Sequence, residues 1–278
     1  ILELSDLTVD GSFCTGGAVC AVMMAMGYPT WLAMVCAFVA GMIAGSITGF
    51  LHTVCKIPAI LAGILTQLGL WTINMFIMGL KDGKLVSTLT IPTRTSNPLV
   101  SAMFLTKALD GSKPFYLYPP LVMGVLTVVV IAVLYWFFGT ERGSSIRATG
   151  ANANMARAQG INTDRNKVIG LMISNGLVAL SGALLAQYQG FADINMGRGA
   201  IVIGLAAIII GEVAFGKLFK NFALKLTAVS LGAVIYYVVI QAVISLLDID
   251  SNYLKLLSAL IVAVFLAVPN LRQKFFKF

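Results

Sequence analysis

The chain has 278 residues, of which 59% are hydrophobic and only 11% are charged, and its mean hydropathy is +0.93. Soluble globular domains carry about 25% charged residues, so this composition excludes a soluble domain and indicates a protein that lies in a bilayer. In a soluble protein the net charge of +8 would suggest a nucleic-acid partner. Here the basic residues stand between apolar runs, where they favour one orientation in the membrane, so no nucleic-acid binding is expected.

Eight apolar segments approach the length that a membrane span requires. A hydrocarbon core of about 30 Å needs about 20 apolar residues at 1.5 Å per residue. The sequence therefore predicts an all-α polytopic membrane protein, a single transmembrane domain over residues 1–278, in which the first and sixth spans are short. The predicted spans are residues 13–26, 31–51, 57–79, 117–138, 168–187, 200–215, 222–247 and 253–268.

Basic residues predict which side of the protein faces the cytoplasm. They follow the second, fourth, sixth and eighth spans, for example Lys56, Arg142, Lys220 and Arg272. Because cytoplasmic loops are enriched in Lys and Arg, these loops are expected on the cytoplasmic side. Residues 80–116 form a long connection that is expected outside although it is also basic.

Small residues form two further patterns near the start of the chain. Gly41, Gly45 and Gly49 recur every fourth residue, so one face of the second span is open to close approach by another helix, either within one subunit or in a dimer. The four cysteines, Cys14, Cys20, Cys36 and Cys55, lack the spacing of a zinc site or a disulfide framework, and free buried thiols are expected.

A polar element that contains glycine precedes each short span, at residues 5–13 and 192–199. The two short spans run in opposite directions in the predicted topology, which divides the chain into half-repeats 1–138 and 166–278. Short, glycine-interrupted segments at corresponding positions of inverted halves indicate a transport pathway, although both elements could instead be ordinary interfacial helix caps. The predicted pathway residues are Asp6, Thr8, Asp10, Gly11, Ser12, Phe13, Asn195, Met196, Gly197 and Gly199.

Polar side chains within the predicted spans are mostly amides and hydroxyls, such as Gln67, Asn74 and Asn175. Most are expected to hydrogen-bond neighbouring helices. No Asp, Glu, His or Arg stands at the centre of a predicted span, whereas transporters driven by ion gradients often carry one there. The driving energy is therefore expected to come from another source.

Residues 211–218 match the phosphate-binding loop pattern except at Leu218, where Ser or Thr should hold magnesium. The pattern also follows a membrane span rather than a buried strand. No Ser-His-Asp, Cys-His or paired-carboxylate arrangement is visible, so no catalytic residue, cofactor or metal is expected on this chain. If ATP drives the protein, ATP and magnesium would be bound by a separate subunit.

From Asp6 onward the chain resembles the permease subunits of ATP-binding-cassette importers in the branched-chain amino-acid and ribose family. The resemblance covers nearly the whole length and rests on Asp6-Leu7-Thr8-Val9-Asp10-Gly11-Ser12, on the stretch from Arg147 to Ile161, and on the sixth span ending at Gly211. The form of the first element is similar to the branch that takes up tryptophan, tyrosine or related solutes. Family members usually have one more helix upstream, so a further segment is expected before Ile1.

The resemblance implies a cytoplasmic coupling loop at residues 139–167. From its residues, Asn152 is expected to cap a two-turn helix and Gly160 to end it in the left-handed conformation. In the family such a helix docks on the ATPase, which implies apolar contacts from Met155 and Ala156 and polar contacts from Arg147 and Arg157. A solvated loop whose arginines only set the orientation is the alternative. The coupling residues implied are Arg147, Gly150, Asn152, Asn154, Met155, Ala156, Arg157, Gln159 and Gly160.

The resemblance further implies a homodimer in the bacterial cytoplasmic membrane, with two cytoplasmic ATPase subunits and an extracellular substrate-binding protein. Asp193 and Arg198, together with residues 81–116, are candidate docking positions for that binding protein. Three alternatives remain: an ion-coupled secondary transporter, a non-transporting membrane scaffold, and an importer of a sugar, a nucleoside or a branched-chain amino acid.

Overall fold

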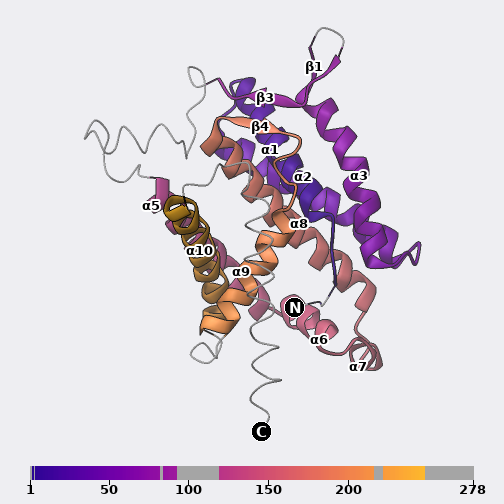
Figure 1. Cartoon of the computed structure of the whole chain (residues 1–278). Helices are drawn as coiled ribbons and strands as arrows, with labels where there is room; N and C mark the ends of the chain where they lie inside the picture. The colour runs from indigo at the N-terminus through magenta and orange to yellow at the C-terminus, as the bar shows by residue number, and fades with distance from the viewer. Residues whose placement is uncertain (1, 3, 82–83, 93–118, 216–221, 248–278) are drawn as a thin grey trace. The chain divides into compact units, whose positions relative to one another are not determined.

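The computed structural model describes residues 2, 4–81, 84–92, 119–215 and 222–247 (Figure 1). Helices dominate this part of the chain, and a few short strands stand between them. In chain order the elements are α1 (Val9–Ala25), α2 (Thr30–Thr53), α3 (Ala59–Met78), β1 (Leu80–Lys81), β2 (Lys84–Leu85), β3 (Thr88–Thr90), α5 (Pro119–Gly139), α6 (Glu141–Ala151), α7 (Ala153–Ala158), α8 (Thr163–Gln189), β4 (Phe191–Asp193), α9 (Ala200–Phe215) and α10 (Phe222–Leu247).

The predicted all-α membrane fold is confirmed. Among the described residues, α2, α3, α5, α8 and α10 are long and apolar enough to cross a membrane, while α1 and α9 are shorter apolar helices. These seven helices correspond to the first seven predicted spans, including the two predicted to be short. The eighth predicted span, residues 253–268, lies outside the described residues.

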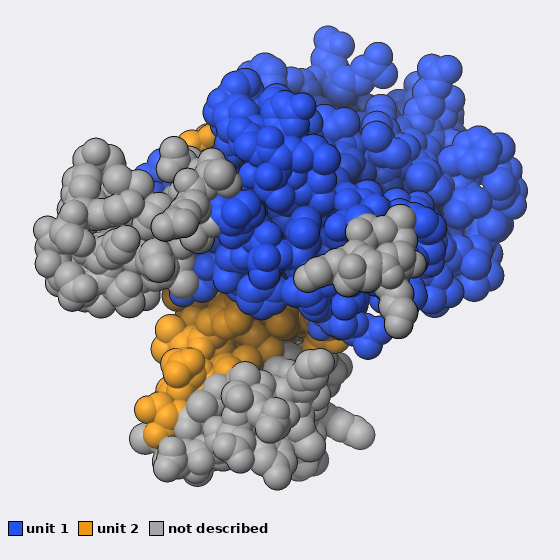
Figure 2. Space-filling view, turned by 90° about the horizontal axis from the view of Figure 1, so that it is seen from above, with its two compact units in different colours: residues 1–126, 136–198 blue, residues 127–135, 199–278 orange. Residues whose placement is uncertain are grey.

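The chain divides into two compact units (Figure 2). Unit 1 contains residues 1–126 and 136–198, and unit 2 contains residues 127–135 and 199–278.

Small residues bring α1, α2 and α8 into close contact inside unit 1. A β-carbon at Gly41 or Gly45 of α2 would overlap the backbone carbonyl oxygen of Asn175 or Leu171 on α8. Likewise, a β-carbon at Gly16 of α1 would overlap the carbonyl oxygen of Ala179. The glycine strip predicted on the second span therefore packs within one subunit, which was one of its two predicted uses.

Two antiparallel strand pairs, which were not predicted from the sequence, involve three strands of the long connection after α3 and one strand that follows α8. β1 pairs with β2, and β3 pairs with β4 so that Thr88 lies opposite Asp193 and Thr90 opposite Phe191. Figure 1 shows β3 and β4 at one end of α8 and the short helices α6 and α7 at its other end. The strand pairs and the short helices therefore mark opposite ends of unit 1.

In unit 2, α9 and α10 pack along one another around the buried side chains of Ile210 and Tyr236. A β-carbon at Gly211 would overlap the carbonyl oxygen of Ala228, and one at Gly232 would overlap that of Ala207. The helical bounds of α9 include residues 211–215, so the first part of the phosphate-loop-like pattern is helix rather than loop. Residues 216–218 of that pattern lie outside the described residues.

Candidate functional site

The segment before α1 has no regular structure and is held by polar contacts. The Thr8 N–H donates to Asp6 Oδ1 at 2.9 Å, and the Thr8 hydroxyl lies 2.8 Å from the hydroxyl of Thr48 on α2. A β-carbon at Gly63 of α3 would lie only 2.8 Å from the nitrogen of Leu7, so this glycine lets the segment approach the helix backbone. Helix α1 begins directly afterwards, at Val9.

Asn175, in the middle of α8, joins this segment to α8. Its Nδ2 donates to Asp6 Oδ2 at 2.7 Å, and its Oδ1 accepts from the Ser12 hydroxyl at 2.6 Å. Asn175 and Ser12 are fully buried. One amide therefore holds both the segment before α1 and the first turn of α1 at the level of the middle of a membrane-spanning helix.

The position of Asp6 qualifies the expectation that no ionisable residue lies at mid-span. Asp6 precedes the span in sequence, but its half-buried carboxylate reaches the centre of α8. Hydropathy along the chain does not detect this, because the segment that carries Asp6 packs beside the helices instead of forming one.

The turn after β4 returns to α1. Cys14 Sγ lies 3.5 Å from the carbonyl oxygen of Asp193, and a β-carbon at Gly197 would overlap the carbonyl oxygen of Asp10. At Gly17 a β-carbon would lie 2.7 Å from the Met196 sulfur. Two of the predicted pathway segments, residues 6–13 and 195–197, are thus in direct contact, whereas Gly199 belongs to unit 2.

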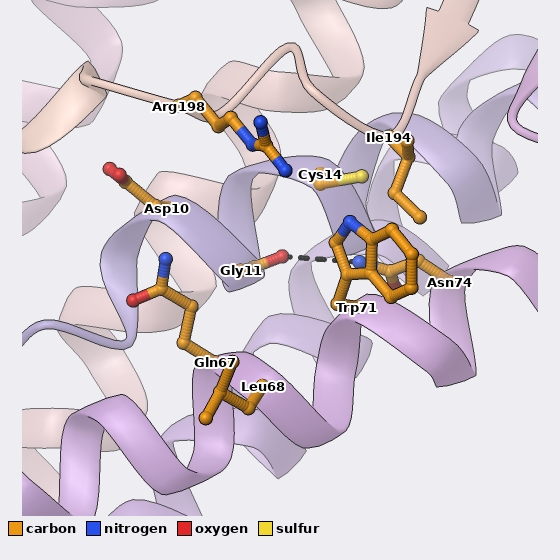
Figure 3. Close-up of a pocket in the computed structure, with 9 residues that line it drawn as sticks. All are labelled: Asp10, Gly11, Cys14, Gln67, Leu68, Trp71, Asn74, Ile194 and Arg198. Atoms are coloured by element: carbon orange, nitrogen blue, oxygen red, sulfur yellow. Dashed lines mark hydrogen bonds between the residues drawn. The ribbon is translucent and has the colours of Figure 1, made fainter.

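A pocket of about 230 Å³ opens beside the first turns of α1 (Figure 3). Three elements of unit 1 line it: α1, α3 and the turn after β4. Its walls carry one acid, one base, two amides and one indole ring. The lining residues are Asp10, Gly11, Cys14, Gln67, Leu68, Trp71, Asn74, Ile194 and Arg198.

The α3 side of this pocket was not among the pathway residues predicted from the sequence. Gln67 and Asn74 were expected to hydrogen-bond neighbouring helices, and Trp71 was not singled out. Asn74 makes one such bond, from its Nδ2 to the carbonyl oxygen of Gly11 at 3.4 Å, but its buried Oδ1 has no hydrogen-bond partner among the described residues. A sequence does not distinguish a satisfied amide from a half-satisfied one.

The two residues predicted to dock a binding protein have different surroundings. The Asp193 carboxylate accepts hydrogen bonds from the Thr88 hydroxyl and from the Asn195 N–H, both at 2.7 Å. Arg198 is exposed, and Figure 3 shows its side chain above the pocket. Docking at these residues stays a prediction.

At the opposite end of unit 1, α7 forms where the coupling helix was predicted. Asn152 Oδ1 accepts from the Met155 N–H at 3.0 Å, which caps the helix, and Gly160 follows with a φ of +80°. The preceding residues, among them Arg147 and Gly150, form the additional helix α6. Asn154 and Gln159 are exposed.

The two apolar residues predicted to contact an ATPase differ in exposure. Met155 is 61% exposed, whereas Ala156 is only 2% exposed. Ala156 packs inside its own chain and presents almost no surface to a partner, so the prediction of an apolar contact is wrong for this residue. The side chain of Met155 remains as an apolar surface.

Contacts with the first turn of α8 hold α6 and α7 in place. Arg157 Nε donates to the Thr163 hydroxyl at 2.8 Å, and its Nη2 lies 3.5 Å from the Asp164 carboxylate. Asn166 Nδ2 donates to the Thr149 hydroxyl of α6 at 2.8 Å. Arg157, predicted to meet a partner's acidic or backbone groups, therefore already has partners in its own chain, and movement of α7 is linked to α8.

Within the described residues, no group of three or more His, Cys, Asp or Glu side chains is arranged to hold a metal ion. The four cysteines are free thiols, as the sequence predicted, and Cys14 and Cys20 are buried. The prediction of burial is wrong for Cys55, which is exposed, and Cys36 is only partly buried.

Comparison with known proteins adds to this geometry. The family model described as the permease component of branched-chain amino acid transport systems matches residues 1–268. A tyrosine transport system permease protein of Clostridioides difficile is 36% identical over 98% of this chain and 84% of its own length. No solved structure matches the chain.

Two further relatives are more distant. An uncharacterized protein of Rickettsia prowazekii, RP368, is 33% identical over 99% of this chain and 90% of its own length. An autoinducer 2 import system permease protein of Yersinia pestis, LsrC, is 29% identical over 77% of this chain and 56% of its own length.

Proposed function

The chain belongs to the family of permease components of branched-chain amino acid transport systems, and we propose that it imports an aromatic amino acid at the expense of ATP. The observation that carries the substrate class is the 36% identity, over 98% of the chain, to a tyrosine transport system permease. Tyrosine or tryptophan is the proposed substrate. Five apolar helices among the described residues and the family match make the chain a multi-pass protein of the bacterial plasma membrane.

The proposed complex contains two copies of this permease, two cytoplasmic ATPase subunits that bind ATP and magnesium, and an extracellular substrate-binding protein. The permease itself would hydrolyse no ATP, because the phosphate-loop-like pattern lacks the magnesium-binding hydroxyl and its first part is helical. Energy would enter through α7, whose exposed Met155 offers an apolar contact beside polar residues.

A continuous series of contacts supports a mechanical role for α7. Arg157 bonds α7 to the first turn of α8, and Asn175 in the middle of α8 bonds Asp6 and Ser12 at the start of α1. Residues of α1 on either side of Ser12, namely Asp10, Gly11 and Cys14, line the pocket. A displacement of α7 by the ATPase would therefore reach the pocket through packed helices.

In this mechanism each nucleotide state of the ATPase binds one conformation of the permease better than the other, and so shifts the population between outward-open and inward-open states. The surface formed by α6 and α7, residues 141–158, is called the α6–α7 platform, and the ATPase would bind there. The difference in binding free energy between the two conformations would arise at this platform. The substrate would then be released into the cytoplasm.

Co-purification from the native host tests the coupling surface. The variant Met155→Asp places a charge in the proposed apolar contact, and Met26→Asp is the matched control, because Met26 is 70% exposed immediately after α1. We expect the ATPase to co-purify with wild type and Met26→Asp but to be lost from Met155→Asp. Retention of the ATPase by Met155→Asp would refute the assignment of α7, and absence of an ATPase from wild type would refute ATP coupling.

The carboxylate of Asp6 favours one second candidate, an ion-coupled transporter, because an acidic group at the level of mid-membrane often marks function. Both Asp6 oxygens, however, accept hydrogen bonds from groups of the same chain. These bonds support a structural role for Asp6, and uptake driven by an ion gradient without an ATPase would support the second candidate.

A further inference from the structure

The pocket beside α1 has a polar side and an apolar side. Figure 3 shows Asp10 and Gln67 on one side, Trp71 and Ile194 on the other, and Arg198 above them. The polar side thus offers a carboxylate and an amide, and the guanidinium adds a donor fork for an anionic group. This arrangement favours a small solute that carries both charges at one end and an apolar group at the other.

The apolar side contains one unsatisfied acceptor. Asn74 is fully buried, and its Oδ1 has no hydrogen-bond partner among the described residues. Its Nδ2 faces the carbonyl oxygen of Gly11, which fixes the amide orientation, because exchanging the two ends would place two oxygens together. A buried acceptor without a partner is destabilising, so a ligand that donates a hydrogen bond to it gains affinity.

The size of the pocket limits the ligand. Pockets for drug-sized ligands span about 300–1,000 Å³, and this one is about 230 Å³. A single amino acid is therefore a better match than a disaccharide.

We propose that this pocket binds the zwitterion of an aromatic amino acid whose ring carries an O–H or N–H donor. Arg198 binds the α-carboxylate, Asp10 and Gln67 bind the α-ammonium group, and Trp71 packs on the ring. Asn74 Oδ1 accepts from the phenol of tyrosine or the indole N–H of tryptophan. The assignment rests on the proposed function and names the chemical feature that would separate tyrosine and tryptophan from phenylalanine.

Equilibrium binding of radiolabelled L-tyrosine tests the site directly. The full-length permease with its ATPase is placed in nanodiscs without the substrate-binding protein, so that the specificity measured is that of the membrane complex. L-Phenylalanine, which lacks the ring donor, and tyramine, which lacks the carboxylate, are the competitors. We expect each to bind about tenfold more weakly than tyrosine, the factor that one net hydrogen bond supplies.

Two variants should remove these preferences separately. Asn74→Leu should abolish the preference for tyrosine over phenylalanine but keep the preference over tyramine, and Arg198→Gln should do the reverse. Misfolding would not produce this crossed pattern. Ser181→Ala is the control, since the exposed Ser181 hydroxyl bonds only the carbonyl of Val178 in its own helix.

Three results would overturn the site: no saturable tyrosine binding to wild type, equal affinity for tyrosine and phenylalanine in wild type, or unchanged preferences in both variants. If Asn74→Leu does not fold, the wild-type comparison and Arg198→Gln at its exposed position decide the outcome. ATP-driven tyrosine uptake by the complete complex would leave the proposed function intact even if the pocket assignment failed. If the complete wild-type complex shows no ATP-driven tyrosine uptake, the proposed function itself is refuted.

Discussion

Replacing Asn175 with alanine should detach the start of α1 from the middle of α8. The substitution removes the bond from Asn175 Nδ2 to Asp6 and the bond from the Ser12 hydroxyl to Asn175 Oδ1. The third bond of Asn175, to the carbonyl of Leu171, lies within α8 and adds little to tertiary stability. The effect should therefore come from two tertiary contacts, one to the segment before α1 and one to α1 itself.

The expected cost is about 2–3 kcal/mol in the free energy of unfolding. A neutral hydrogen bond contributes about 0.5–1.5 kcal/mol and one to a charged group about 1.5–3 kcal/mol, whereas bonds between membrane helices average about 0.6 kcal/mol. The Asp6 bond is charge-assisted and the Ser12 bond is fully buried, which places the sum above the membrane average.

Unfolding by SDS in mixed micelles, followed by tryptophan fluorescence, measures this cost. Ser181→Ala on the same helix is the control and should change stability by less than 0.5 kcal/mol, the usual range of surface substitutions. Asp6→Asn should also cost less in the Asn175→Ala background than in wild type, because the two groups share one bond. If Asn175→Ala is as stable as wild type, the bonds of Asn175 do not hold the start of α1 against α8.

Two further substitutions test the packing of α2 against α8 and the role of the α6–α7 platform. Gly45→Leu should destabilise the fold by several kcal/mol in the same unfolding measurement, because the new side chain would overlap the backbone of α8 at Leu171. Gly69→Leu on α3 is the control and should not destabilise the fold, because the space around Gly69 is open. Asn152→Ala should remove the cap of α7, at a cost of about 1 kcal/mol for that helix, and lower substrate-stimulated ATP hydrolysis by the assembled complex without changing its thermal midpoint. Unchanged hydrolysis would show that the cap has no part in coupling.

The membrane helices could be predicted from the sequence because hydropathy reports directly on the solvent around them. The bounds of α9 and α10 agree with the prediction at both ends, since each apolar run ends in polar or glycine residues. Helix α1 begins four residues before its predicted start, at Val9 instead of residue 13. Its first turn contains Asp10, Gly11 and Ser12, which are not apolar, so the apolar run used for the prediction starts after them. Tertiary contacts stabilise this turn of helix.

Elements that depend on distant partners were not predictable in the same way. β3 and β4 pair residues that α5 to α8 separate in the chain, and β3 is only three residues long. Helix α6 carries no apolar stripe; the Thr140 hydroxyl, which accepts from the Gly143 N–H, is the local signal that could have revealed it.

In the candidate site, too, features set by local sequence could be predicted and features set by tertiary packing could not. The capped helix α7 followed from local residue chemistry. The structure brings the two glycine-containing segments into contact, and their role in a pathway stays a prediction. Which face of α3 meets α1 depends on tertiary packing, so Trp71 and Asn74 entered the site only with the structure. The burial of Ala156 likewise depends on how α7 lies against its own chain.

Tyrosine uptake into proteoliposomes shows whether ATP drives import through this permease. The permease is reconstituted with its ATPase and substrate-binding protein, with no gradient of sodium or protons across the membrane. Our prediction is that radiolabelled tyrosine accumulates only when ATP and magnesium are supplied on the ATPase side, and that Met155→Asp abolishes this uptake while Met26→Asp does not. Accumulation that follows an imposed sodium or proton gradient in vesicles containing the permease alone would contradict it.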